Sequence, residues 1–369
     1  MALIDDEGRL FGVVNVIDAL VVLLILAVLI AGVALLNPFA STETPEQDAP
    51  LETTERYATI DFGEQRPFVA EQLSTGDVMN STDVTVTDVH VGPASGTNVT
   101  VIARVRINDS LSADGESFRY RGDGVRQGSE FTLETAAYTA NGTIIRLDTE
   151  GAVLGTDTTA VALGTTVSNT VANAIEIGDT FEIAGQSVAT VQTANVYPTD
   201  DESTRRVLLG LDLQTVARGS GVYFGNDRVA LGETVPFEAG AYSLSGTVLA
   251  RGSYAPGNTS TETISVTVEN VDPDFAGGIE AGMVEQSMGR TTAEIVDKRV
   301  EPATVILTSE DGQIYERTHP RNEDVSLTVD VTVRETADGY QFHGRSLKEG
   351  DQITLDFRTI TVQGTVTDI

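Results

Sequence analysis

Three histidines are the side chains of this sequence with the clearest capacity for metal or acid–base chemistry. They are His90, His319 and His343, and none of them pairs with a second histidine at the spacing of a metal-binding motif. The chain has no Cys, which removes disulfides, cysteine-ligated zinc and thiol nucleophiles together. We therefore expect no metal site, and we expect the histidines to occupy surface or turn positions.

Other short motifs offer little chemistry. A G-x-S-x-G nucleophile elbow is absent, and the glycine-rich stretch GDGVRQG, residues 122–128, lacks the spacing and the following helix of a phosphate-binding loop. The Arg-Gly-Asp tripeptide at residues 121–123 is too short to specify an adhesion function. Acidic stretches at residues 106–117 and 199–204 carry oxygen ligands suited to Ca²⁺, but solvated acidic loops are the simpler interpretation. The sequence predicts neither an enzyme nor a cofactor.

The charge of the chain is strongly one-sided. Its 369 residues include 55 acidic and 23 basic side chains, a net charge of −32, and the only lysines are Lys298 and Lys348. Such self-repelling carboxylates keep a protein soluble at high salt, so the composition is typical of a halophile. The same charge repels phosphates, and nucleic acid is therefore not an expected partner.

An apolar segment near the N-terminus predicts a membrane anchor. The uncharged run from Ala19 to Leu36 spans about 27 Å as a helix, close to the thickness of a hydrocarbon core, and Pro38 ends it. Arg9 precedes the run, and the next basic residue is Arg56. The positive-inside rule then places the N-terminus in the cytoplasm and the bulk of the chain outside the cell membrane.

Two features of this segment leave alternatives open. The sequence NPFAST after the apolar run resembles a cleavage site, so the run could be a signal peptide, although its N-terminal region is acidic. Asp18 is either a partner for another intramembrane group or, more simply, a carboxylate near a helix N-terminus at headgroup depth.

Residues 39–55 are acidic, polar and contain two prolines, which predicts an extended stalk. Five N-glycosylation motifs follow it, and they agree with an external location. The candidate acceptors are Asn80, Asn98, Asn108, Asn141 and Asn258.

The remainder of the chain contains three copies of one pattern. Each copy has an upstream glycine before a strand that ends at Pro93, Pro198 or Pro302, and a second glycine followed fourteen residues later by Gly-Thr. Apolar residues alternate with polar ones between these points, as in half-buried strands joined by tight turns. The repeat-defining glycines are Gly76, Gly128 and Gly142 in the first copy, Gly178, Gly232 and Gly246 in the second, and Gly282, Gly350 and Gly364 in the third.

These patterns define the expected domains. We predict a cytoplasmic motif and transmembrane helix at residues 1–38, the acidic stalk at residues 39–55, and β-domains at residues 56–150, 156–252 and 261–369. Short strands and turn glycines over a hundred residues favour a small barrel or sandwich. The predicted fold class is mainly β, with a transmembrane helix followed by three tandem small barrels.

The N-terminal stretch LIDDEGRLFGVVNVIDALVVLL, residues 3–24, resembles the opening of a family of uncharacterised single-pass membrane proteins of prokaryotes. The repeat half that ends in Gly-Thr-Val is similar to the external domain of that family. The matching residues are Ile4, Asp5, Gly8, Arg9, Leu10, Phe11, Gly12, Asn15, Ile17 and Asp18.

The middle copy also resembles the mammalian-cell-entry (MCE) domain. The likeness rests on Gly178, Asp179, Gly185, Val188 and Val191, whereas Ala189 stands where that family usually has glycine. The resemblance implies small barrels that assemble as homo-oligomeric rings and move lipids through a central channel. The first copy lacks a counterpart of that second glycine, the third has Met in place of the aspartate, and no apolar pore-lining loop is evident.

Together these observations predict a membrane-anchored scaffold of three external β-domains that self-associates. The more specific form of this hypothesis is an MCE-like ring, or stack of rings, that handles lipids. The alternative is a monomeric stalked module that binds a surface-layer protein or a glycan. The Gly- and Ser-rich segment at residues 250–263 favours flexibility, and hence the alternative.

Overall fold

The computed structural model describes residues 53–79, 83–111, 117–308, 313–336 and 339–369, and a few residues nearer the N-terminus. The chain separates into two compact units, residues 1–52 and 53–369. In the first unit, β1 (Arg9–Leu10) pairs antiparallel with β2 (Val14–Asn15). Most of the predicted membrane helix from Ala19 to Leu36, and Asp18, lie outside the described residues. Within the described part of the chain, no helix has both the length and the hydropathy needed to cross a bilayer.

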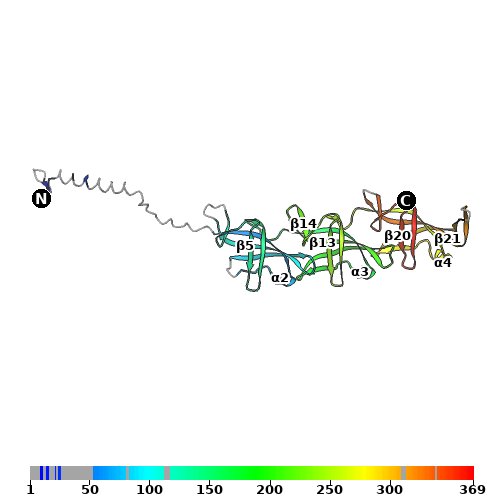
Figure 1. Ribbon diagram of the computed structural model, residues 1–369, viewed down its shortest axis with the longest axis horizontal. Helices are drawn as coiled ribbons and strands as arrows, with labels where there is room; N and C mark the ends of the chain where they lie inside the picture. Colours follow the sequence, from blue (N-terminus) through cyan, green and yellow to red (C-terminus); the bar gives the residue numbers. More distant parts are fainter. Residues whose placement is uncertain are drawn as a thin grey trace. The chain divides into compact units, whose positions relative to one another are not determined.

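The second unit consists mainly of antiparallel strands, which confirms the prediction of a mainly β chain (Figure 1). Its strands form three groups, and no strand of one group pairs with a strand of another. We call residues 53–148 module 1, residues 156–251 module 2 and residues 259–368 module 3. The eight-stranded sheets of modules 2 and 3 curl into half-barrels, and module 1 has a five-stranded sheet and a separate two-stranded hairpin.

The strands have the following bounds. Module 1 contains β3 (Thr53–Gln65), β4 (Val84–Pro93), β5 (Val99–Ser110), β6 (Arg119–Tyr120), β7 (Asp123–Gly124), β8 (Glu130–Glu134) and β9 (Thr139–Asp148). Module 2 contains β10 (Thr156–Ser168), β11 (Thr180–Ile183), β12 (Gln186–Pro198), β13 (Thr204–Arg218), β14 (Gly221–Phe224), β15 (Asp227–Arg228), β16 (Thr234–Ala239) and β17 (Tyr242–Arg251). Module 3 contains β18 (Thr259–Val271), β19 (Val284–Ser287), β20 (Arg290–Thr308), β21 (Ile314–Thr336), β22 (Gly339–Phe342), β23 (Arg345–Ser346), β24 (Gln352–Asp356) and β25 (Thr361–Asp368).

The three modules share one strand order. In module 2 the order is β11-β12-β13-β10-β17-β16, and in module 3 it is β19-β20-β21-β18-β25-β24. Module 1 follows the same order as β4-β5-β3-β9-β8, without the first edge strand. At that edge a single bridge between Val78 and Thr85 takes the place of the missing strand. The repeat found in the sequence is therefore a repeat of strand topology.

A six-residue helix follows the first strand of every module: α2 (Pro67–Gln72), α3 (Asn169–Ala174) and α4 (Pro273–Gly278). Each helix buries one alanine, Ala70, Ala172 or Ala276, against the sheet. The small side chain lets so short a helix lie close to the strands, and the packed face rather than helix propensity stabilises it.

The central strands of the modules differ in how they are buried. Side chains alternate between the two faces of a strand, so burial on one face gives a period of two. In module 3, β21 follows this period from Val325 to Val333. In module 2, however, residues 207–211 of β13 are all buried, and so are residues 99–105 of β5 in module 1. The outer faces of β5 and β13 are therefore covered, whereas that of β21 is open.

Candidate functional site at the module junctions

Modules 1 and 2 meet where the end of β4 contacts the tip of the β14–β15 hairpin. Gly225 at this tip has a left-handed backbone, with φ of +61°. A Cβ added to Gly225 would lie 1.9 Å from the carbonyl oxygen of Pro93, and one added to Gly92 would lie 2.6 Å from the Cα of Gly225. The N–H of Asn226 donates a hydrogen bond to the same Pro93 oxygen, at 3.3 Å. Two glycines are needed because the two backbones touch.

Polar contacts flank this approach. The side-chain amide of Asn226 donates to a carboxylate oxygen of Glu64 at 2.9 Å. Arg218 of β13 lies 3.8 Å from Asp61 of β3, and both side chains are about one quarter exposed. Acidic groups of module 1 thus face donors of module 2.

The linker between modules 1 and 2 packs into the same junction. Leu154 is buried in a cluster with Ile102 of β5 and Val216 of β13. Its N–H donates to a carboxylate oxygen of Asp88 at 2.8 Å. This cluster covers the outer face of β5 and explains the continuous burial of that strand.

Modules 2 and 3 meet in the same way but with different side chains. His343 stands at the tip of the β22–β23 hairpin, and its φ is +51°. Its imidazole stacks on the ring of Tyr197, the residue before Pro198, with a centroid distance of 4.7 Å and an interplanar angle of 21°. The ring of Phe342 stacks against the imidazole with a centroid distance of 3.6 Å. Tyr197 is thus the positional counterpart of Gly92, and His343 that of Gly225.

A buried carboxylate holds His343 in place. Glu285 of β19 is 3 % exposed, and one of its oxygens lies 2.7 Å from Nε2 of His343. The hydroxyl of Thr292 donates to the same carboxylate at 2.6 Å, and the N–H of Asp356 donates at 2.9 Å. Burial raises the pKa of Glu285, but the His343 charge and these hydrogen bonds outweigh it and lower the pKa below its ordinary value.

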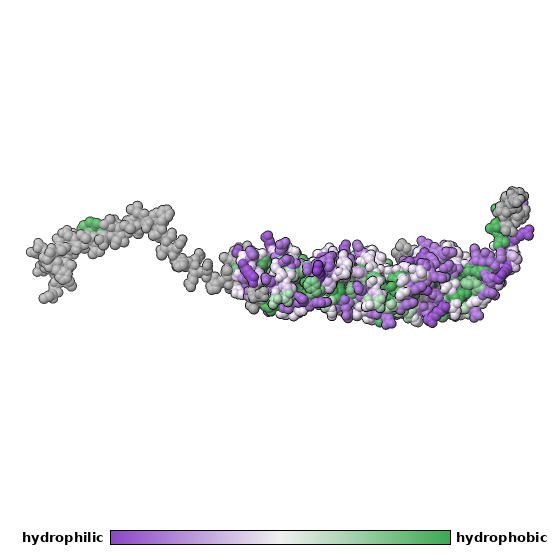
Figure 2. Space-filling model, turned by 60° about the horizontal axis from the view of Figure 1, so that its bottom comes forward, coloured by the Kyte–Doolittle hydropathy of each residue, from purple (hydrophilic) through white to green (hydrophobic). Residues whose placement is uncertain are grey.

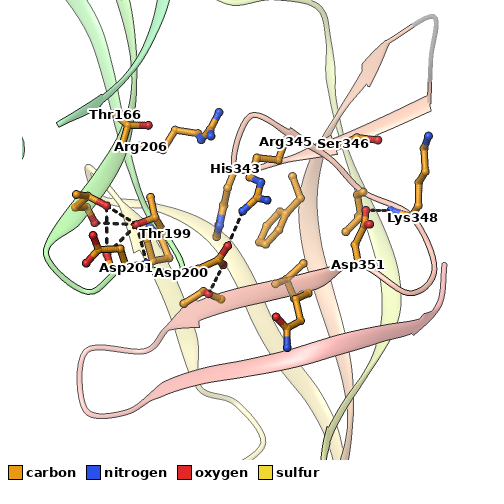
Figure 3. A pocket seen from close by; sticks show the side chains of 17 residues that line it. Thr166, Thr199, Asp200, Asp201, Arg206, His343, Arg345, Ser346, Lys348 and Asp351 are labelled. Carbon is orange, nitrogen blue, oxygen red and sulfur yellow. Dashed lines mark hydrogen bonds and ion pairs between the residues drawn. The ribbon is translucent and has the colours of Figure 1, made fainter.

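A pocket of about 700 Å³ opens beside this pair (Figure 3). Asp200 of module 2 accepts hydrogen bonds from Arg345 at 2.9 Å and from the hydroxyl of Thr354 at 3.1 Å, both in module 3. The hydrogen bond from Arg345 is the main reason why the pKa of Asp200 is lowered. Arg206 donates in turn to the backbone oxygen of Gly344 at 3.4 Å. These groups hold the two modules together.

The histidines follow the expectation only in part. At a turn, His319 accepts hydrogen bonds at Nδ1 from the N–H groups of Arg321 and Asn322. His90 is instead buried in β4, so a surface role is wrong for it, and Nε2 of His90 has no partner among the described residues. Burial, followed by the charge of Arg218, lowers its pKa to about 4. It is therefore neutral at neutral pH.

The two acidic stretches use their oxygens locally. Asp201 accepts from the N–H and the hydroxyl of Ser203, at 2.8 and 2.7 Å. In the other stretch, Asp109 accepts from the N–H of Arg121, at 2.8 Å, at the tip of the β6–β7 hairpin that carries the Arg-Gly-Asp tripeptide. Across the described residues, no group of three or more His, Asp or Glu side chains is arranged to bind a metal ion.

Six of the nine repeat-defining glycines occupy equivalent turns, with φ between +82° and +98°. Each donates its N–H to a strand residue that returns a hydrogen bond to the residue after the glycine; Gly178, for example, donates to Val191, whose N–H donates to Asp179. Left-handed backbone explains the choice of glycine. The six are Gly76, Gly178 and Gly282 before the first hairpin of each module, and Gly128, Gly232 and Gly350 before the second.

The other three glycines lie on the last strand of each module, where it pairs with the first strand of the same module. A Cβ on Gly142 would lie 2.7 Å from the backbone oxygen of Asp61, and one on Gly364 would lie 2.5 Å from a methyl group of Val266. At Gly246 the nearest atom would be 3.0 Å away, on Leu163. Each crossing coincides with a register shift in the first strand, so the missing side chain permits the bulge.

A pair of residues links the two hairpins of each module. Tyr242 donates its hydroxyl to Asp179 at 2.6 Å in module 2, and Tyr138 donates to Asp77 at 3.0 Å in module 1. In module 3 the same two places hold Met283 and Ile360, which pack against the core there. Module 3 therefore has an apolar pair where modules 1 and 2 have a polar pair, and both residues of the pair differ together.

Among the candidate glycosylation acceptors, Asn98, Asn141 and Asn258 are exposed, and Asn108 is half-buried in β5. Asn80 lies outside the described residues.

The junction residues were not evident as sites in the sequence. The signal available was the residue before the repeated proline, which is Gly92, Tyr197 or Glu301 in the three copies. Its importance depends on the hairpin tip it meets, more than a hundred residues away along the chain. A buried Glu285 was also missed, because the sequence around it, VEQS, looks like an ordinary polar strand.

Comparison with known proteins identifies a family. The model of a domain of unknown function (DUF4330) matches residues 1–110 and 253–369, more than half of the chain. The chain belongs to the DUF4330 family. The matched regions contain module 3 and strands β3, β4 and β5, whereas module 2 lies between them. No curated protein and no solved structure matches the chain.

Proposed function

We propose that this DUF4330 protein is a membrane-anchored scaffold outside the cytoplasm, whose three β-modules are held in a fixed relation to one another. The single observation that carries the proposal is the repeated junction. The hairpin tips Gly225 and His343 meet the residues before Pro93 and Pro198 at equivalent positions, by backbone contact with Gly92 in one junction and by ring stacking on Tyr197 in the other. A chain of independent binding modules has no need of such contacts.

The linkers support this proposal because they are tied to the modules. In the first linker, Arg104 donates to the backbone oxygen of Gly151 at 2.9 Å. In the second, the hydroxyl of Tyr254 donates to Asp212 at 2.8 Å, and Arg334 donates to the backbone oxygen of Gly257 at 3.1 Å. The composition of residues 250–263 suggests a flexible tether, but β17 extends to Arg251, β18 begins at Thr259, and the residues between them are held on both sides.

The finer form of the proposal is that each module is a small MCE-like barrel and that the chain assembles as a homo-oligomer. The β11–β12 hairpin supports it, since Gly185 at its turn has φ of +75°, and Gly289 in module 3 has φ of +82°. Handling of lipids remains part of this form only.

Distances between modules test the scaffold directly. Because the chain has no Cys, nitroxide labels can be placed singly at Thr132→Cys in β8 and Gln363→Cys in β25, both exposed strand positions. Pulsed electron resonance on the full chain should give one narrow distance distribution. A broad distribution, unchanged when the junctions are weakened, would favour the alternative of a stalked monomer with flexible linkers.

The anchor and the oligomer need a separate measurement. Full-length protein should fractionate with membranes and require mild detergent for extraction at high salt. Light scattering with detergent subtracted should then give a defined multimer, in which bound lipid can be sought by mass spectrometry. A protein that stays monomeric in every salt and detergent condition would instead direct attention to surface-layer or glycan partners.

A further inference from the structure

Two halves of the repeated junction are left over in the chain. Among the three modules of residues 53–369, module 1 stands first, so its hairpin has no described module to dock on. Module 3 stands last, so its proline end at Pro302 receives no hairpin within these residues. The leftover hairpin tip carries Arg121, whose φ of +54° matches those of Gly225 and His343. The leftover proline end carries Glu301, in the place of Gly92 and Tyr197.

We propose that these two ends bind each other between copies, so that the chain self-associates head to tail through Arg121 of one copy and Glu301 of the next. Inside the chain this position pairs glycine with glycine and ring with ring, and the pair left over joins a cation to a carboxylate. Both side chains are exposed, and neither forms an ion pair within the described residues.

The conformation of the hairpin tip is fixed in the absence of a partner. The left-handed backbone of Arg121 is unfavourable for a residue with a side chain, and it is held by the hydrogen bond from its N–H to Asp109. The guanidinium lies over the ring of Tyr120, 5.2 Å from its centroid. Arg121 is thus presented at the tip in the same way as His343.

A cation bound at the receiving end would reduce a repulsion between carboxylates there. Glu301 of β20 stands directly opposite Asp324 of β21 in the register. Like charges at opposed positions of an antiparallel pair are destabilising. In module 2 the corresponding pair is Tyr197 and Arg206, which carries no such repulsion. The oxygens of Asp324 already accept from the N–H groups of Asn270 and Thr304, so an incoming guanidinium would pair with Glu301 and offset the repulsion through a charge-assisted contact.

A projecting ribbon completes the receiving end. After Pro302 the β20–β21 pair continues as two strands, whereas β4–β5 and β12–β13 turn at once. Ile306 and Ile314 on this ribbon are each 72 % exposed, and Figure 2 shows hydrophobic surface there. In modules 1 and 2 the turn at this place lies against the next module, lining a pocket with it. The exposed isoleucines therefore lie where an incoming module 1 would cover them.

The contact between copies is more polar than the contacts within the chain. Ser326 of β21 is exposed at the place held by Ile102 in β5 and Leu208 in β13, both buried. A polar outer face is what keeps a terminal repeat soluble. Association between copies is therefore expected to be reversible, and a head-to-tail contact produces either a closed ring or an open filament.

Charge reversal tests the proposal on the full-length protein in mild detergent. By sedimentation across a range of concentrations, Arg121→Glu and Glu301→Arg should each raise the dissociation constant at least tenfold. An equimolar mixture of the two variants should recover association, because every junction in an alternating row is again between opposite charges. Arg119→Glu, on the same hairpin but away from its tip, and Glu294→Arg, exposed on β20 but away from Pro302, are the matched controls.

Disulfide trapping provides a second readout. A chain carrying both Arg121→Cys and Glu301→Cys should form intermolecular disulfides under mild oxidation, since bonding requires Cα atoms within about 7 Å. A ladder on a denaturing gel would indicate an open row, and one closed species a ring. Wild-type protein that is monomeric at all concentrations, or multimers that neither charge reversal affects, would overturn the proposal. Neither outcome depends on the membrane anchor, which fractionation tests separately.

Discussion

The two junctions of this chain bring equivalent positions of neighbouring modules together with different chemistry. Between modules 1 and 2, Gly92 and Gly225 bring backbone against backbone. Between modules 2 and 3, Tyr197 and His343 place two rings in the same position, with Glu285 buried behind them. The difference teaches that the repeat conserves the approach of a left-handed hairpin tip to a proline end. The side chains then decide whether close packing or a titratable pair maintains the contact.

The largest effect is expected from closing the space at the first junction. Gly225→Ala places a Cβ 1.9 Å from Pro93 and should cost about 4 kcal/mol, combining overpacking with left-handed strain. Gly219→Ala is the matched control, since its φ is +57° and a Cβ there meets no atom within 4 Å. Distance distributions between labelled modules should broaden for Gly225→Ala alone. Equal behaviour of the two variants would mean that the Pro93 contact does not hold the modules.

At the second junction, Glu285→Gln should cost about 3 kcal/mol at neutral pH, because it replaces a buried carboxylate that is hydrogen-bonded to His343, Thr292 and the N–H of Asp356. The pKa of Glu285 is lowered on folding from an ordinary value of 4.5, so its contribution is complete above that pH and is lost as the pH falls through the lowered value. Hydrogen exchange of module 3 amides should thus separate variant from wild type at pH 7, and the difference should shrink as the pH is lowered below 4.5. A difference that does not change with pH would contradict a role for the ionised carboxylate.

The first junction has its own acid-sensitive group in a different pH window. His90 has a pKa of about 4 in the folded protein and an ordinary value of 6.5, so the unfolded chain binds more protons below pH 6.5 and stability falls from there down to pH 4. Between pH 7 and pH 5 the loss should be about 2 kcal/mol. His90→Asn, which installs the residue found at this place in module 2, should remove that loss. Unfolding curves at the two pH values, compared between variant and wild type, check this.

The smallest effect concerns the polar pair inside a module. Tyr242→Phe removes the hydrogen bond to Asp179 and should cost about 1 kcal/mol. Burial, then this hydrogen bond, raises the pKa of Tyr242. Combining Tyr242→Ile with Asp179→Met copies the pair of module 3, and the double variant should be more stable than the two single costs predict. Additive costs in a double-mutant cycle would show that the two positions are independent.

Much of the β architecture could be predicted from local signals. Alternating residues marked the strands, and glycines such as Gly178 and Gly232 marked the turns that need left-handed backbone. The buried positions of His90 and Glu285 could not be predicted in this way, because their neighbours are on strands that pair or dock only in the folded chain.

The sequence by itself determined that this chain is mainly β, that its pattern occurs three times, and that glycine is required at particular turns, since alternation and backbone conformation are properties of neighbouring residues. Only the tertiary structure decided that Gly92 meets Gly225 and that Tyr197 meets His343. Those contacts depend on how one folded module docks on the next. The same docking identified Arg121 and Glu301 as its two unpaired ends, although in the sequence they are an exposed arginine and one acidic residue among many.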